Sequence, residues 1–393
     1  MLFRSVYTGK QELEYRDAAD PSPQGDDCLI RVASVGICGS DMHAYLGHDE
    51  RRPAPLILGH EAAGVVVSGP GEGRRVTVNP LVSCMRCAAC ASGRENLCPD
   101  RQIISMPPRQ GAFAQYVCLP QRNLVEIPDG FAEDKAALAE PLACGWHAVR
   151  LAADALHQPA PECAALVIGG GAIGVGAALS LQAKGFASVT VAEAHEGRRE
   201  FSRRKIALHA VHLNALEESQ FDLVIDAVGL AATRKAASSL VKPGGVIVHI
   251  GLGEAEGGLD IRRMTLQEVT FIGTYTYTMQ DFRDTAQAMF DGRLGALDWC
   301  EAHMDQVAEG YAFSKEAIIV WTQFMGAQLI KKGIRINCSL PSPTQTPMMK
   351  TFHETSGKAV VDAAAEPLGR YTTPEEQAGP LVLINSDAAA VVN

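Results

Sequence analysis

The sequence has no long apolar run and no excess of basic residues. No stretch of about 18 consecutive apolar residues occurs, so we expect no membrane span. The formal net charge is -10, which argues against the basic face that a nucleic-acid backbone requires. The opening residues, MLFR, lack the charged-then-apolar pattern of a signal peptide. We therefore expect no membrane and no nucleic acid as partner.

The length and composition predict a multidomain globular protein. A chain of 393 residues is expected to form two or three domains. Its hydrophobic share of 47% and charged share of 20% are typical of soluble globular enzymes. Eleven cysteines, several of them clustered, fit a reducing compartment, so we expect a cytoplasmic protein.

Four of the cysteines follow the pattern C-x-x-C-x-x-C-x7-C. Four thiolates at such spacing can close a tetrahedral shell around zinc and leave no position open for a substrate. Unrelated cysteines or two disulfides are the alternative, but small polar residues and arginines surround the cluster and no oxidising compartment is indicated. We predict a structural zinc site made of Cys84, Cys87, Cys90 and Cys98.

Three further segments of the first 150 residues carry metal-ligand types. These segments are 36–43 (GICGSDMH), 59–61 (GHE) and 140–143 (EPLA). Cys38, His60 and a carboxylate of Glu61 or Glu140 would give three protein ligands and leave the fourth position open, as in a catalytic zinc site. Taken singly, each has a plainer interpretation as a buried thiol, a loop histidine or a solvated glutamate.

A glycine-rich turn follows the apolar run 164–168 and precedes an apolar helix over 175–183. The turn reads G-x-G-x-x-G, in the strand–turn–helix setting of dinucleotide-binding folds. We predict that it binds a pyrophosphate through Gly169, Gly171, Ala172, Ile173 and Gly174.

The next predicted strand, 188–192, ends at an acid. Glu193 lies 19 positions after Gly174, where a carboxylate can bind the adenosine ribose hydroxyls and repel a 2′-phosphate. We therefore expect NAD. Arg198 and its neighbouring arginines weaken this preference, so NADP stays open. Further apolar runs at 221–226, 244–251 and 271–276 predict the remaining strands of a parallel sheet.

From about residue 20 to 310 the chain resembles the zinc-dependent medium-chain dehydrogenases, in particular their polyol branch. The resemblance rests on the segments above, on 111–117 (GAFAQYV) and on their order. It implies an α/β protein with a GroES-like, β-rich catalytic domain at 1–150 and a Rossmann, doubly wound parallel-sheet domain at 151–310. It also implies a homo-oligomer, dimer or tetramer, and two Zn²⁺ per chain.

The resemblance assigns roles around the open zinc site. Cys38 and His60 would bind the metal, with Glu61 or Glu140 completing the shell. Ser40 would accept the proton of a bound alcohol and His43 would pass it to solvent. Asp41 would fix the histidine tautomer. The implied reaction is hydride transfer between a secondary alcohol, a polyol or sugar acid, and NAD(P).

The last 83 residues, 311–393, do not match that family. They resemble the C-terminal part of a short-chain dehydrogenase, whose catalytic pair Tyr-x-x-x-Lys would correspond to Tyr311 and Lys315. The glycine-rich turn and serine of that family have no equivalent upstream. We expect an atypical α/β tail of helix, strand and helix. Two rival functions follow: a metal-free carbonyl reductase using Tyr311 and Lys315, or a fusion protein that binds zinc and nucleotide without turnover.

Overall fold

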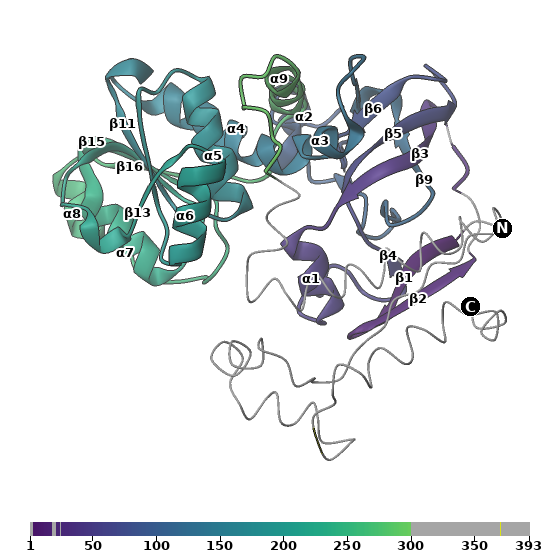
Figure 1. Cartoon of the computed structure of the whole chain (residues 1–393), viewed down its shortest axis with the longest axis horizontal. Helices are drawn as coiled ribbons and strands as arrows, with labels where there is room; N and C mark the ends of the chain where they lie inside the picture. Colours follow the sequence, from purple (N-terminus) through teal and green to yellow (C-terminus); the bar gives the residue numbers. More distant parts are fainter. Residues whose placement is uncertain (1–2, 18–20, 24, 300–369, 371–393) are drawn as a thin grey trace. The chain divides into compact units, whose positions relative to one another are not determined.

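The computed structural model describes residues 3–17, 21–23, 25–299 and 370 (Figure 1). The tail predicted over 311–393 lies outside the described residues, except for Arg370. Residues 1–302 form one compact unit. Within the described residues, no helix has the length and apolar character that crossing a membrane would need.

The first part of the chain is built on antiparallel sheets. The largest has the strand order β10-β6-β5-β3-β9. Alternate side chains of these strands form one core, in which Ile30, Val66 and Leu119 are fully buried. Its strands are β3 (Asp27–Gly36), β5 (Glu61–Ser68), β6 (Arg75–Val78), β9 (Tyr116–Pro120) and β10 (Leu124–Glu126).

Two smaller sheets and short helices complete this antiparallel region. The three-stranded sheet has the order β2-β1-β4, and β7 pairs with β8. The elements are β1 (Phe3–Gly9), β2 (Glu12–Asp17), β4 (Leu56–Ile57), β7 (Leu81–Val82), β8 (Gln102–Ile103), α1 (Gly39–Tyr45), α2 (Ala88–Ala91), η1 (Glu95–Leu97), η2 (Gln121–Asn123) and α3 (Glu133–Ala137).

The second part contains a six-stranded sheet whose neighbouring strands are all parallel. Its order is β13-β12-β11-β14-β15-β16, so the chain reverses its winding direction between β11 and β14. Ligands of such sheets bind outside the carboxyl ends of the strands at this reversal. The strands are β11 (Ala164–Ile168), β12 (Ser188–Ala192), β13 (His209–Val211), β14 (Phe221–Asp226), β15 (Val241–His249) and β16 (Thr270–Gly273).

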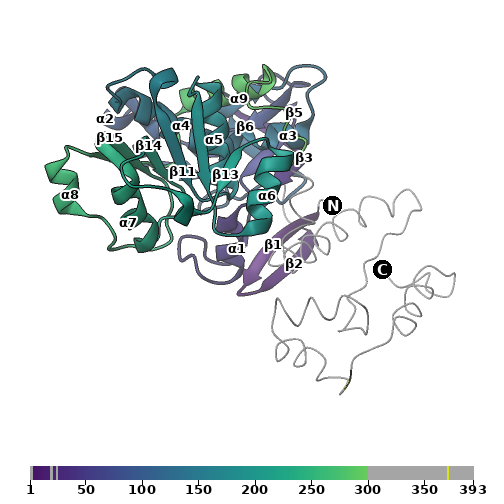
Figure 2. The same ribbon diagram turned by 60° about the vertical axis from the view of Figure 1, so that its left-hand side comes forward.

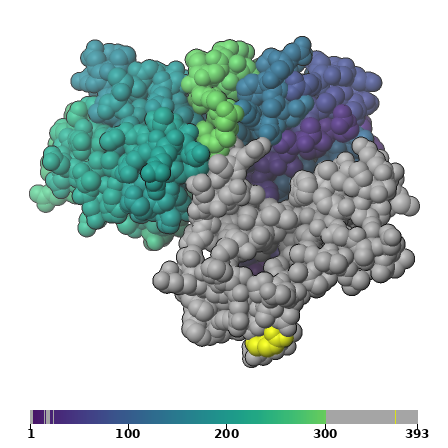
Figure 3. Space-filling model, in the orientation of Figure 1, coloured from purple at the N-terminus to yellow at the C-terminus, as the bar shows by residue number. Residues whose placement is uncertain are grey.

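Helices cover both faces of this sheet, as the two views in Figures 1 and 2 show. Apolar side chains of α4, α5 and α9 pack on one face, and those of α7 pack on the other. The helices are α4 (Ala139–Ala155), α5 (Ala172–Ala183), α6 (Glu196–Lys205), α7 (Ala231–Leu240), α8 (Ile261–Leu266) and α9 (Met279–Phe290), with the short turns η3 (Ala160–Glu162) and η4 (Leu213–Ala215). In Figure 3, α9 is drawn in green.

The predicted strands at 164–168, 188–192 and 221–226 match β11, β12 and β14. The last predicted strand, 271–276, was wrong beyond Gly273, where β16 ends. Three positions after the strand ends, Thr276 has φ 48°, a left-handed conformation that a β-branched residue rarely adopts and that does not fit an extended strand. The predicted domain boundary at residue 150 falls within α4.

Candidate metal centres and dinucleotide site

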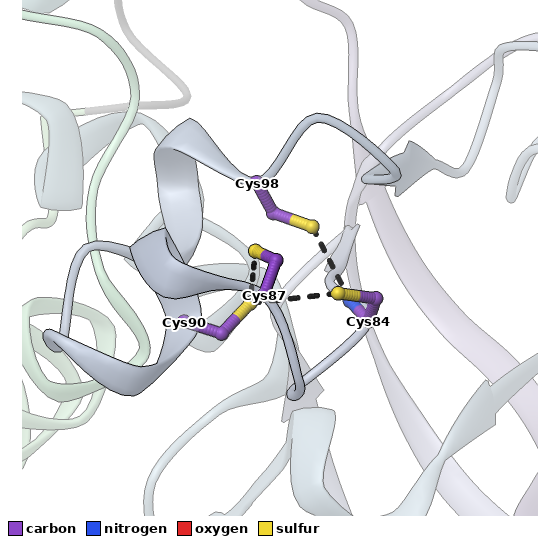
Figure 4. A group of neighbouring side chains, drawn as sticks. All are labelled: Cys84, Cys87, Cys90 and Cys98. Atoms are coloured by element: carbon purple, nitrogen blue, oxygen red, sulfur yellow. Dashed lines mark hydrogen bonds between the residues drawn. The ribbon is translucent and has the colours of Figure 1, made fainter.

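The four cysteines of the predicted closed site converge on one point. Figure 4 shows their side chains turned toward one another, around the short helix α2. The Cys87 and Cys90 sulfurs lie 3.5 Å apart, and those of Cys84 and Cys90 lie 4.0 Å apart. Sulfurs bound to zinc at about 2.3 Å in a tetrahedron lie about 3.8 Å from one another. The loop therefore fits a tetrahedral zinc.

The thiols of this loop differ in their electrostatic surroundings. The backbone N–H of Arg86, above all, lowers the pKa of the Cys84 thiol to about 6. Burial raises the pKa of Cys90 to about 12 and also raises that of Cys98. Metal ligation requires thiolates, so a bound divalent cation would favour the thiolate form of these cysteines.

A second group of metal-ligand atoms comes from residues distant in the sequence. The ligand atoms of Cys38, His60 and Glu61 all lie within 4.8 Å of one another. Cys38 precedes helix α1, His60 directly precedes strand β5, and Glu61 is the first residue of β5. The structure therefore brings three of the four predicted ligands into one cluster.

Gly36 makes room for the carboxylate in this cluster. Gly36 and Glu61 are opposite each other in the β3–β5 ladder. A Cβ atom at position 36 would lie 2.2 Å from Glu61 Oε2. Any side chain at position 36 would therefore displace the carboxylate from its position beside Cys38.

The ring of His60 is oriented by two neighbours. Its Nδ1 atom lies 3.5 Å from Asp41 Oδ1 and 3.2 Å from Ser105 Oγ. The Asp41 carboxylate also accepts the backbone N–H groups of Gly59 and Cys38, each at 3.0 Å. With Nδ1 occupied in this way, Nε2 is the atom available to a metal.

Glu140 lies on the first turn of α4 and is outside the three-residue cluster. The hydroxyl of Tyr277 donates a hydrogen bond of 2.6 Å to its Oε1 atom. Burial, and to a lesser degree the charge of Glu140, raise the pKa of Glu61 to about 7. Burial likewise raises the pKa of Glu140. The two buried carboxylates, the Cys38 thiol and the His60 ring form a donor set that fits a divalent cation.

Ser40 and His43 follow Cys38 on helix α1. They are three positions apart, so their side chains lie on neighbouring turns of the same face. Ser40 is half-buried and His43 is exposed. The helix therefore leads from the metal cluster toward solvent.

The glycine-rich turn joins β11 to α5, as predicted. Gly169 has φ 104°, and a Cβ atom on Gly174 would lie 1.8 Å from the Gly169 carbonyl oxygen. A Cβ atom on Gly171, by contrast, would meet nothing within 4 Å. Gly171 directly precedes the first turn of α5, which contains Ala172 and Ile173. This open space at a helix N-terminus fits a dinucleotide pyrophosphate.

Glu193 follows strand β12 beside this turn. Its two carboxylate oxygens accept the backbone N–H groups of Gly170 and His195, each at 2.8 Å. Arg198 Nη1 lies 4.0 Å from Glu193 Oε2. The structure therefore places the acid and the arginine of the predicted cofactor site next to each other.

Sequence reasoning missed Ser105 and Tyr277. Both are fully or almost fully buried, and both touch a predicted ligand through a side-chain oxygen. Ser105 has φ 66°, an uncommon conformation for a serine. No spacing rule relates either residue to its partner, because 45 and 137 positions separate them in the chain.

Comparison with known proteins gives the same assignment for most of the chain. The family "alcohol dehydrogenase GroES-like domain" matches residues 24–129, and "zinc-binding dehydrogenase" matches residues 172–291. The L-galactonate-5-dehydrogenase of Escherichia coli K12 is 35% identical over 73% of this chain and 86% of its own length. The sorbitol dehydrogenase of Bacillus subtilis 168 is 33% identical over 70% and 82%.

A solved structure supports the same fold. A protein of Sinorhizobium meliloti 1021, described as a zinc-binding dehydrogenase bound to NADP, is 27% identical, with a TM-score of 0.68 over 75% of this chain and 89% of that one. The chain belongs to the zinc-binding medium-chain dehydrogenases. The predicted GroES-like and Rossmann folds, the zinc and nicotinamide cofactors and the oxidoreductase class are confirmed.

The end of the chain matches a different family. The family "enoyl-(acyl carrier protein) reductase" matches residues 278–393. This match agrees with the short-chain resemblance predicted for 311–393. Tyr311 and Lys315 lie outside the described residues.

Proposed function

We propose that this dehydrogenase oxidises a secondary alcohol of a polyol or sugar acid with NAD. The observation that carries the proposal is the Cys38–His60–Glu61 cluster, which offers three ligands and is separate from the closed four-cysteine loop. The relatives named above act on a sugar acid and on sorbitol, which supports this substrate class.

The chain's own residues would hold the groups of the reaction. Bound zinc would supply Lewis-acid polarisation of the alcohol oxygen, and bound NAD would supply the hydride acceptor. Ser40 would take the hydroxyl proton, and His43, exposed one turn further along α1, would release it to solvent. The alcohol thus loses a hydride from carbon and a proton from oxygen.

Glu61, rather than Glu140, would complete the ligand set. A carboxylate oxygen of Glu61 lies within 4.8 Å of the ligand atoms of Cys38 and His60. Glu140, by contrast, is hydrogen-bonded to Tyr277. Glu140 would then act on a ligand water. For the cofactor, the carboxylate of Glu193 supports NAD over NADP, with Arg198 as the residue that moderates the preference.

The proposed chemistry is tested by metal content and by turnover of the same preparation. We expect two zinc ions per chain and oxidation of polyols or sugar acids that a chelator abolishes. One metal per chain, confined to the cysteine loop, together with unchanged oxidation, would refute the proposal.

The family match over residues 278–393 supports a second candidate function, that of a carbonyl reductase that uses Tyr311 and Lys315. Chelator-resistant carbonyl reduction that a Tyr311→Phe variant loses would favour it. If calorimetry detects NADH binding and no substrate is turned over, the chain is instead a nucleotide- and zinc-binding protein.

We also propose a homo-oligomer that assembles through the edge of the parallel sheet. Strand β16 is an edge strand, and Phe271 on it and Ile261 and Leu266 on α8 are exposed. Light scattering should show a dimer or tetramer, which a charged residue at position 271 should disrupt.

Because the thiolates of both sites require reducing conditions, we propose the cytoplasm as the compartment.

A further inference from the structure

A short segment that leads from β16 into α9 contacts both the four-cysteine loop and Glu140, which lies near the open metal cluster. We call residues 275–279 the bridge. At one end, the side-chain amide of Asn96, in the cysteine loop, donates a 2.8 Å hydrogen bond to the Tyr275 carbonyl. The Glu95 carboxylate accepts the backbone N–H of Met279. In the middle, the Tyr277 hydroxyl reaches Glu140.

We infer that Tyr277 is a positioning residue for Glu140, and that the four-cysteine loop holds Tyr277 in place through the bridge. The inference rests on the proposed function, because it concerns the same metal cluster. It gives the closed loop a role beyond its own folding: the loop sets the orientation of a carboxylate at the open centre.

The bridge is held in a conformation that it would not adopt alone. Thr276 has φ 48°, and its buried hydroxyl has no hydrogen-bond partner among the described residues. Such a residue persists only where its surroundings determine the backbone on both sides. Here the cysteine loop supplies contacts on one side, including the Arg101 guanidinium 4.8 Å from the Tyr275 ring centre.

The other side of the bridge is fixed to α4, the helix that carries Glu140. The Asp281 carboxylate accepts hydrogen bonds from the Thr278 hydroxyl at 2.7 Å and from Arg150 Nε at 2.7 Å. His147 Nδ1 lies 2.7 Å from the same carboxylate. Tyr277 and Glu140 therefore meet between two elements whose relative position is fixed by buried polar contacts.

Tyr277 is held in the protein interior. Its side chain is 1% exposed and packs against Phe282, with ring centres 5.7 Å apart. Its hydroxyl donates a hydrogen bond to one of the two carboxylate oxygens of Glu140, Oε1. Removing the hydroxyl would remove the hydrogen bond that holds Glu140 Oε1.

The test is Tyr277→Phe, which removes one oxygen atom and keeps the ring. Zinc release from the purified holoenzyme to a colorimetric chelator is followed over time, together with kcat and KM. We expect release from the open centre to be about tenfold faster and kcat to fall about tenfold, because mutation of the outer groups around a metal site typically costs about 10- to 100-fold in metal affinity or activity. The KM for NAD and the slow release from the loop should stay unchanged.

Tyr275→Phe is the matched control, because it removes a hydroxyl two residues away and keeps the ring that faces Arg101. It should behave as the wild type. Asn96→Ala removes the loop's hydrogen bond to the bridge and should speed release from the open centre roughly threefold, the worth of one hydrogen bond.

The outcomes separate this inference from the proposed function. An active, two-zinc wild type with a Tyr277→Phe variant of unchanged release and kcat would overturn the role of Tyr277. An effect of Tyr277→Phe without any effect of Asn96→Ala would overturn the link to the cysteine loop. A wild type with zinc in the loop alone would refute the proposed function. If Tyr277→Phe does not fold, the inference is tested with Asn96→Ala. Unchanged zinc release from the open centre of that variant would overturn it.

Discussion

The two candidate metal centres differ in how far apart their ligands lie in the sequence. The closed centre takes all its ligands from one loop, Cys84 to Cys98, around a helix of four residues. The open centre takes Cys38 from the start of α1 and His60 and Glu61 from the start of β5, with Glu140 on α4 nearby. The first needs little besides local spacing, whereas the second exists only when several elements have packed. We therefore expect damage to the closed centre to cost stability and damage to the open centre to cost activity.

The largest expected effect is on activity. Cys38→Ser removes a ligand of the open centre, and we expect kcat/KM to fall by about 1,000-fold, because several kcal/mol of polarisation are lost. The melting temperature should stay within a few degrees of the wild type. Steady-state kinetics measures the change in kcat/KM, and calorimetry measures the melting temperature. If Cys38→Ser lowered activity and stability to a comparable degree, the open centre would not be specific to catalysis.

The complementary variant is Cys98→Ser. Cys98 is fully buried, and metal binding in such a loop contributes directly to folding. We expect the free energy of unfolding to fall by more than about 4 kcal/mol, measured by urea denaturation. The fraction that stays folded should retain its KM for the alcohol.

Gly36→Ala affects the open centre without touching a ligand. The added methyl group would meet Glu61 Oε2, so we expect a loss of about 10- to 100-fold in kcat/KM. Gly39→Ala is the matched control, because a Cβ atom there meets nothing within 4 Å. Equal activities of the two variants would show that the Glu61 carboxylate does not need its observed position.

The smallest expected effect belongs to Asp281, which is a ligand of neither centre. Burial disfavours its charge, but hydrogen bonds from His147, Arg150 and Thr278 prevail and hold the pKa of Asp281 well below its usual range. Because the folded-state pKa is lowered, its contribution to stability is complete above the unfolded value of about 3.9 and is lost as the pH falls below it.

Asp281→Asn should therefore lower the free energy of unfolding by about 2 kcal/mol at neutral pH. The difference from the wild type should shrink as the pH falls from about 4 toward 2, which denaturation curves across that range would show. A difference that grows toward acid pH would contradict the assignment of the charge.

Much of the fold was predictable because its signals are local. The strand–turn–helix around Gly169 and Gly174 and the cysteine spacing each lie within one short window of sequence. Their geometry follows from glycine sterics and ligand distance, which do not depend on distant residues.

The contacts of the open centre were not predictable in the same way. The choice between Glu61 and Glu140 depends on Gly36 lying opposite Glu61 and on Tyr277 reaching Glu140. The last strand was predicted too long because the apolar and β-branched run continues past Gly273, while the backbone turns at Thr276. Tertiary contacts with Asn96 and Glu95 overrode the local preference there.

Helix α4 has Glu140 in its first turn and Gly145 in its second. A Cβ atom at Gly145 would lie 2.5 Å from the backbone nitrogen of Ala177, so α4 and α5 touch main chain to main chain. Helix α5 starts directly after Gly171 of the glycine-rich turn. This close crossing fixes the distance between the helix that carries Glu140, near the open metal cluster, and the helix that begins at the glycine-rich turn.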